Sequence, residues 1–167
     1  MHPQENNYAF IDAQNLHLGI KELGWKLDWS RFRVYLKDKY RVTLAYVFIG
    51  YVASNAQLYS SLQQSGYVIV FKPTLPDRHG KVKGNIDADM VLQAMIDFLK
   101  YDKAVLISSD GDFYSLVKYL YEQNKLRIVL SPHIDTCSSL LKINAREKIE
   151  FIDSLRGKVE YKRKSTA

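Results

Sequence analysis

Four aspartates, from three separate parts of the sequence, occupy positions from which their carboxylates could act together. Asp12 ends the apolar run YAFID, Asp110 and Asp112 follow the apolar run AVLISS, and Asp87 opens a segment with helical periodicity. If the two runs are neighbouring parallel strands, their carboxyl ends meet in one crevice. Crowded carboxylates raise one another's pKa unless a cation compensates, and Mg²⁺ and Mn²⁺ prefer oxygen ligands. The four aspartates therefore predict a divalent-metal site suited to phosphoryl chemistry.

Three nearby side chains are expected to have supporting roles. Asn15 could orient Asp12 or a water molecule, although an asparagine between a strand and a helix is as often a turn residue. Ser109 could bind a phosphate oxygen or simply fit the end of a strand. Asp89 lies two positions from Asp87 and points elsewhere on a helix, so we expect it to stabilise the helix N-terminus electrostatically.

Asp112 has a second interpretation, which is structural. It could cap the helix expected to begin at Phe113, because aspartate is a preferred N-cap residue. Gly111 permits a tight turn, which would let the carboxylates of Asp110 and Asp112 face the same cavity. Both interpretations of Asp112 remain open from the sequence.

The charge distribution indicates a polyanionic partner. The chain has 24 Lys and Arg against 18 Asp and Glu, for a net charge of +6, which favours such partners. Residues 87–112 nevertheless contain six acids, of which Asp97 and Asp102 are expected to be surface charges. The loop before Asp87 is basic, and its cations are predicted to hold a nucleic-acid backbone without reading its sequence. These cations are Lys72, Arg78, Lys81 and Lys83.

Apolar runs that alternate with helical patterns must position these residues. Residues 14–25 are expected to form a loop with a short helical turn, and residues 73–85 a loop, because they contain two prolines and two glycines. Strands are predicted at 8–12, 42–52, 67–72, 103–109 and 126–132, and helices at 30–40 (capped by Ser30), 54–65, 87–101, 112–124 and 138–155. The alternation predicts an α/β fold with a mostly parallel, doubly wound sheet and helices on both faces.

Length and composition exclude several classes of protein. A chain of 167 residues corresponds to one domain, expected at 1–155, with a basic C-terminal tail at 156–167. The single cysteine, Cys137, cannot form an intrachain disulfide or a zinc site. The N-terminus does not resemble a signal peptide, and no apolar run reaches the roughly 18 residues of a membrane span. We therefore expect a cytoplasmic protein with no membrane partner.

Three segments together resemble a known family. They are FIDAQN at 10–15, KGNIDADMVLQAM at 83–95 and VLISSDGDFYSLV at 105–117. In this order and spacing they resemble the NYN branch of the PIN-like nuclease superfamily, which includes LabA-like proteins. The resemblance implies a single PIN-like domain with strand order 3-2-1-4-5 and an endoribonuclease site dependent on Mg²⁺ or Mn²⁺. Asp12, Asp87, Asp110 and Asp112 match the family's acids, and Asn15 matches its asparagine.

The sequence departs from the family pattern at three positions. Gln93 occupies a position near which family members often have a further acid, and Ser109 and Ser115 replace the usual glycine and proline. The leading hypothesis is a metal-dependent endoribonuclease that acts on single-stranded or structured RNA, with a homodimer left open. The alternative is a non-catalytic RNA-binding or regulatory module with a vestigial acidic site. A haloacid-dehalogenase-like phosphatase ranks lower, because FIDAQN lacks a second aspartate two residues after Asp12. A receiver domain also ranks lower, because the late strand LRIVLSP supplies no lysine.

Overall fold

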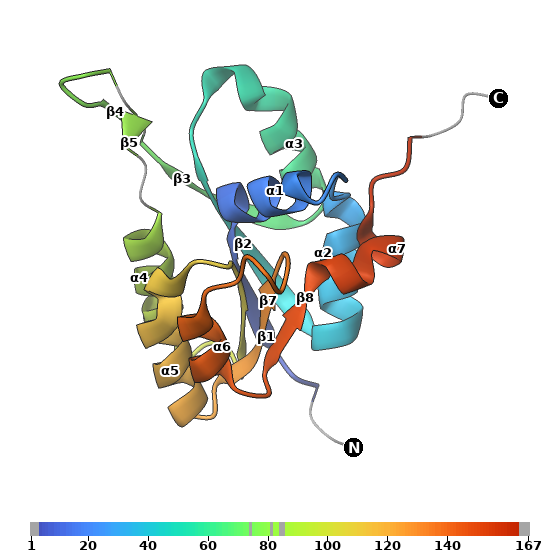
Figure 1. The fold of residues 1–167 in the computed structure, drawn as a ribbon, viewed down its shortest axis with the longest axis vertical. Helices are drawn as coiled ribbons and strands as arrows, with labels where there is room; N and C mark the ends of the chain where they lie inside the picture. The colour runs from blue at the N-terminus through green and yellow to red at the C-terminus, as the bar shows by residue number, and fades with distance from the viewer. Residues whose placement is uncertain (1–3, 74, 81, 84–85, 164–167) are drawn as a thin grey trace.

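A six-stranded parallel sheet forms the centre of the molecule (Figure 1). The computed structural model describes residues 4–73, 75–80, 82–83 and 86–163. The strands lie in the order β3-β2-β1-β6-β7-β8. Their bounds are β1 Asn7–Asp12, β2 Val42–Gly50, β3 Tyr67–Lys72, β6 Ala104–Ile107, β7 Leu126–Ser131 and β8 Ile149–Phe151. The predicted fold class and order 3-2-1-4-5 are confirmed, and β8 adds a sixth strand at one edge.

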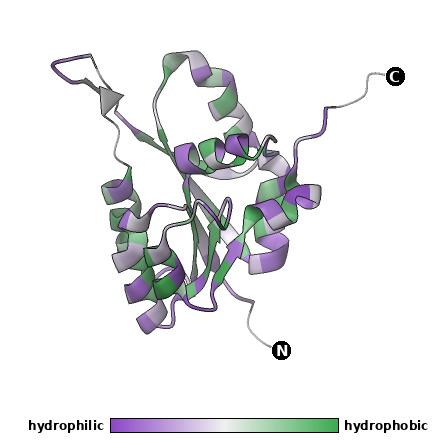
Figure 2. Ribbon diagram, in the orientation of Figure 1, coloured by the Kyte–Doolittle hydropathy of each residue, from purple (hydrophilic) through white to green (hydrophobic). Residues whose placement is uncertain are grey.

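Helices cover both faces of the sheet and create two hydrophobic cores. Ala9 and Ile11 of β1 pack into one core, and Phe10, between them, packs into the other. Burial on both faces explains why the strands are almost continuously apolar, as Figure 2 shows along the centre of the molecule. The first core includes α1 Ala13–Glu22, α2 Trp29–Tyr40, α3 Ala56–Gln64 and α7 Arg156–Val159, and the second includes α4 Asp87–Ile96, α5 Tyr114–Glu122 and α6 Ser139–Ala145.

The first helix lies where a loop and short turn were expected. Helix α1 begins directly after Asp12, which is its N-cap, and it buries Leu16 and Ile20. The spacing of four residues places both side chains on one face of the helix, and packing against the sheet stabilises it. The expected cap of the next helix was also wrong, because the side chain of Asp28 rather than Ser30 accepts a hydrogen bond from the helix.

The C-terminal region is more irregular than the single helix expected at 138–155. Helix α6 ends at Ala145, since Arg146 adopts a positive φ of 54°, which interrupts the helix. Strand β8 and the 3₁₀ turn Ile152–Leu155 follow. Helix α7 lies inside the segment expected to be a tail, and its Val159 is fully buried. The chain thus remains packed on the domain beyond residue 155.

Helix α4 also differs from expectation. It ends at Ile96 rather than near Tyr101, and it buries Met90 and Ala94. In the sequence, apolar residues recur with helical spacing from Ala88 to Leu99 and predict one buried stripe, but Leu92 and Leu99 of this stripe are exposed. Before α4, the expected loop contains a small antiparallel hairpin of β4 Leu75–Pro76 and β5 Val82–Lys83.

Among the residues placed in the structure, no helix combines the length and apolar character needed to cross a bilayer.

Candidate metal centre

Asp12 is fixed at the junction between β1 and α1. One carboxylate oxygen accepts a hydrogen bond from the backbone N–H of Asn15 at 3.3 Å, and the other accepts one from the Ser108 hydroxyl at 3.2 Å. Only 5% of Asp12 is exposed. Burial raises the pKa of Asp12 above its ordinary value, the two hydrogen bonds oppose this rise, and the charge of Asp110 adds to it. Asp12 is therefore a rigidly held carboxylate in an unfavourable electrostatic environment.

Asp110 is positioned by the end of β6. Its carboxylate caps the 3₁₀ turn Gly111–Phe113 by accepting a hydrogen bond from the backbone N–H of Asp112 at 2.9 Å. Its own backbone N–H donates to the hydroxyl of Ser108 at 3.1 Å. Because Ser108 also donates to Asp12, one serine connects the two strand ends. Asp110 has the capping role considered for Asp112, which leaves the exposed carboxylate of Asp112 available for other contacts.

Gly111 is required for space rather than for a left-handed backbone. Its φ is not positive, unlike those of Gly24, Gly66 and Gly80. A Cβ atom at this position would collide with the side chain of Ser138, whose hydroxyl caps α6. The glycine thus allows the turn that contains Asp110 to pack closely against α6.

Asp87, the first residue of α4, completes the group. One carboxylate oxygen from each of Asp87, Asp110 and Asp112 lies within 4.8 Å of the others. These three residues and Asp12 line a hollow of about 370 Å³ that also includes Asn15, here called the acidic crevice. Burial, followed by the charges of the other three aspartates, raises the pKa of Asp87 to about 6.

The side chain of Asn15 ties the start of α1 to the end of β6. Its amide donates to the Ser109 hydroxyl at 2.8 Å, and its carbonyl accepts from the Ser109 backbone N–H at 2.8 Å. Asn15 is therefore a structural clamp beside Asp12, and the hydroxyl of Ser109 is engaged by that clamp. The link that Ser108 makes between Asp12 and Asp110 was not predicted. The position of Ser108 two residues before Asp110, at a strand end, was the only sequence signal for this link.

Comparison with known proteins identifies the family. The sequence model of the NYN domain matches residues 8–154. The chain belongs to the NYN domain family. The resemblance seen in the three sequence segments is thus confirmed, and membership of this family supports a PIN-like nuclease fold. None of the curated proteins compared with this NYN domain matches it significantly.

A solved structure supports the same fold. The crystal structure of a protein of unknown function from Vibrio parahaemolyticus RIMD 2210633 is similar to this NYN domain, with a TM-score of 0.78. The similarity covers 96% of this chain and 99% of that one, at 22% sequence identity. At this identity the likeness concerns the fold alone.

The structure describes only some of the four basic residues that were predicted to contact RNA. Lys72 ends β3, and Arg78 is exposed at the hairpin, which projects from the molecule beyond α4 (Figure 1). Lys83 lies in β5, although its side chain is outside the description, and Lys81 is outside the described residues altogether. The described lining of the acidic crevice contains no cation. Asp89 is exposed on α4 and does not line the crevice.

The donor set of this NYN domain fits a divalent cation. Within the described part of the chain, no Lys, Arg or His forms an ion pair with Asp12, Asp110 or Asp112. The ligand atoms are all carboxylate oxygens, which suit hard ions such as Mg²⁺ and Mn²⁺ and not the softer transition metals. A bound cation would also relieve the mutual repulsion that raises the pKa of Asp87.

Proposed function

We propose that this NYN domain is an endoribonuclease that depends on Mg²⁺ or Mn²⁺. The observation that supports this most directly is the acidic crevice, in which four aspartates from β1, α4 and the end of β6 converge. Burial, and then the charges of the other three aspartates, raise the pKa of Asp87 in this crevice. A site of this kind is suited to binding metal and hydrolysing a phosphodiester bond.

The four aspartates have two kinds of role in this proposal. Asp87, Asp110 and Asp112 hold the ion, because their oxygens already lie close together. When bound, Mg²⁺ or Mn²⁺ activates water and neutralises charge on the phosphate. Asp12 supplies a fourth carboxylate, held by Ser108 and by the N–H of Asn15. The clamp between Asn15 and Ser109 keeps the ends of β1 and β6 at a fixed separation.

The substrate in this proposal is RNA, single-stranded or structured. The phosphates of the RNA would be contacted by the cations that precede α4 in the sequence, which are Lys72, Arg78, Lys81 and Lys83. Contacts of this kind position a backbone and do not read bases.

Metal-dependent cleavage is the test. A labelled RNA should be cleaved by the purified protein in Mn²⁺, not in EDTA, and again after Mn²⁺ is restored. The Asp110→Asn variant should lose cleavage. Asp135→Asn is the matched control, because Asp135 is an exposed acid whose side chain is 83% accessible and lies outside the crevice. Cleavage by Asp110→Asn at the rate of the unmodified protein would overturn the proposal.

One observation favours a non-catalytic RNA-binding module as a second candidate. Gln93 lies near the position at which family members often have a further acid, and its amide donates to Asp97 at 3.0 Å. Gln93 is thus part of a structural hydrogen-bond network. This candidate requires salt-sensitive RNA binding without turnover in any divalent metal.

A further inference from the structure

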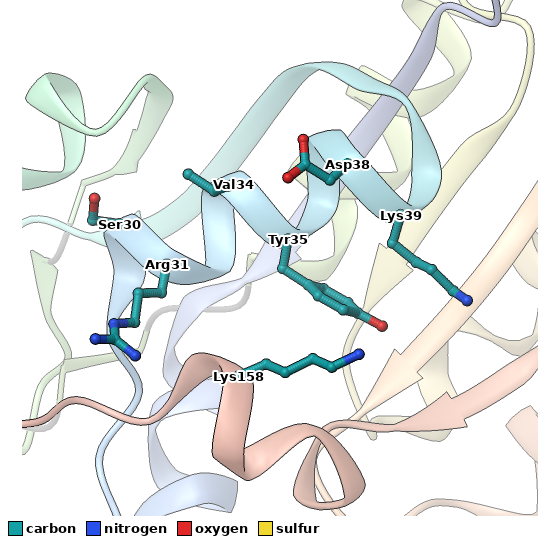
Figure 3. Close-up of a pocket in the computed structure, with 7 residues that line it drawn as sticks. All are labelled: Ser30, Arg31, Val34, Tyr35, Asp38, Lys39 and Lys158. Atoms are coloured by element: carbon teal, nitrogen blue, oxygen red, sulfur yellow. The ribbon is translucent and has the colours of Figure 1, made fainter.

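A second hollow lies on a different part of the molecule, between α2 and α7. Its volume is about 560 Å³, against about 370 Å³ for the acidic crevice, and the two share no residue. Figure 3 shows the lining residues of α2, with Arg31, Tyr35 and Lys39 on the edge that faces Lys158 of α7. We call this hollow the basic groove; its lining is Ser30, Arg31, Val34, Tyr35, Asp38, Lys39 and Lys158.

The basic groove has an excess of uncompensated positive charge. Arg31, Lys39 and Lys158 face it together with a single acid, Asp38. Arg31 lies 3.8 Å from the carboxylate of Asp28. Neither of the two lysines forms an ion pair with any described residue, and both are exposed. Exposed cations that form no ion pair attract anions.

An apolar and aromatic wall accompanies these cations. Val34 is 55% exposed, and the ring of Tyr35 extends from α2 towards the side chain of Lys158 (Figure 3). The Nζ of Lys158 lies 5.9 Å from the centre of that ring. Cations beside an aromatic ring form the combination with which proteins bind the phosphates and bases of single-stranded nucleic acid.

The spacing of the cations favours a polymer over a single phosphate. Arg31 and Lys39 are eight residues apart on α2, which corresponds to about 12 Å along the helix axis. One phosphate group cannot neutralise both ends of such a row, whereas successive phosphates of one strand can. Lys158 lies across the groove from this row, so a strand laid along α2 would have cations on both sides.

We propose that the basic groove binds a segment of single-stranded RNA outside the segment that enters the acidic crevice. The identification of the polymer as RNA rests on the proposed function. The groove contributes to binding alone, because none of its residues reaches the acidic crevice. Its loss should therefore raise KM for a long RNA and leave kcat unchanged, which is the signature of lost uniform binding.

Binding without cleavage gives the direct test. Anisotropy of a labelled, unstructured RNA of about 30 nucleotides is measured in EDTA over a range of salt concentrations. The variant Lys39→Gln/Lys158→Gln should bind about tenfold more weakly. Its salt dependence should be shallower by roughly 0.7 for each phosphate contact removed. Asp38→Asn should bind more tightly, because it removes the one acid in the groove.

The matched control is Lys118→Gln/Lys142→Gln, in which the two lysines lie on α5 and α6, on the other face of the sheet. Unchanged affinity in this control, with weakened affinity in the groove variant, supports the proposal. Equal loss in both variants, or no loss in the groove variant, overturns it. Because the assay needs no turnover, it still reports on the groove if the protein cleaves no RNA. Normal cleavage together with unaltered binding by the groove variant would reject the groove alone.

Discussion

Helix α4 has a carboxylate near each end, and the surroundings of the two are opposite. Asp87, at its start, faces the three other aspartates of the acidic crevice, and its pKa is raised to about 6 by burial and by those charges. Asp97, at its end, is only 1% exposed. Its carboxylate accepts hydrogen bonds from the Tyr46 hydroxyl at 2.6 Å and the Gln93 amide at 3.0 Å, and Lys100 lies at 3.0 Å. Burial alone would raise the pKa of Asp97, but these three donors outweigh it and hold the pKa below its ordinary value.

The difference is the one expected between a structural carboxylate and the metal ligand proposed here. The folded protein supplies donors and a cation to Asp97, so its charge stabilises the fold. The fold brings the charges of three other aspartates to Asp87, and their repulsion is unfavourable until a cation binds. Perturbed carboxylates of the second kind concentrate at functional sites. Substitutions at the two ends of α4 should therefore affect different properties.

The largest expected difference is in cleavage. Asp87→Asn should lower the rate of RNA hydrolysis about a hundredfold or more, because the metal loses one of three closely placed ligands. Asp97→Asn should change the rate no more than a few-fold when assayed well below its melting temperature. Rates are compared under single-turnover conditions with saturating Mn²⁺. Equal loss in both variants would show that the two ends of α4 do not differ in function.

Metal binding should give the next largest effect. Mn²⁺ at a hundred times its dissociation constant would stabilise the folded state by about 2.7 kcal/mol. For a chain of this size, that raises the melting temperature by several degrees. Asp87→Asn and Asp112→Asn should lose most of this shift, while Asp97→Asn should retain it. Thermal unfolding with and without Mn²⁺ measures this, and a full shift in Asp87→Asn would remove Asp87 from the ligand set.

Replacing the carboxylate should change the stability of the metal-free protein in opposite directions at the two ends of α4. Asp97→Asn should lower the free energy of unfolding by about 2 kcal/mol, since it loses the ion pair with Lys100 and leaves buried donors poorly matched. Tyr46→Phe should lower it by about 1 kcal/mol. Asp87→Asn should stabilise the metal-free protein slightly at neutral pH, because it removes one of four crowded charges. Urea unfolding in EDTA measures all three, and a stable Asp97→Asn variant would contradict the structural role.

Sequence patterns predicted the sheet well because each central strand is a dense apolar run. The same runs located Asp12 and Asp110, since parallel strands in this order must bring both carboxyl ends to one crevice. The helix beginning at Asp87 was equally visible. Local sequence is sufficient where a residue ends a strand or begins a helix, because the topology then determines where its side chain lies.

The environment of Asp97 could not be predicted in this way. Its burial depends on Tyr46, which lies 51 positions away in β2, and on the rotation of α4 against the sheet. The apolar stripe gave the wrong rotation, because Leu92 and Leu99 are exposed while Met90 is buried. The short strand β8 also depends on contacts between segments distant in sequence, and no local pattern indicated it. The cations of the basic groove lie in two basic stretches of the sequence, 21–41 and 156–167, but only the packing of α7 against α2 brings them together.

The smallest effect expected from the comparison is in the pH dependence of stability without metal. The folded-state pKa of Asp87 is about 6, above its ordinary value of 3.8, so between these values the folded protein binds more protons than the unfolded chain. Its contribution to stability therefore falls as the pH rises from about 4 to about 6. The pKa of Asp97 is lowered in the folded state, so its contribution is present above about pH 4 and is lost on further acidification.

Urea midpoints measured in EDTA from about pH 3 to about pH 7 should resolve the two effects. Asp87→Asn should flatten the decline between about pH 4 and about pH 6, leaving a residual slope from Asp12, whose pKa is also raised. Asp97→Asn should keep that decline and reduce the loss of stability below about pH 4. If both variants flatten the same part of the profile of stability against pH, then the pKa shifts of Asp87 and Asp97 do not have opposite signs. If each flattens its own part, the acidic crevice opposes folding and Asp97 supports it, which is the arrangement expected of a site completed by a cation.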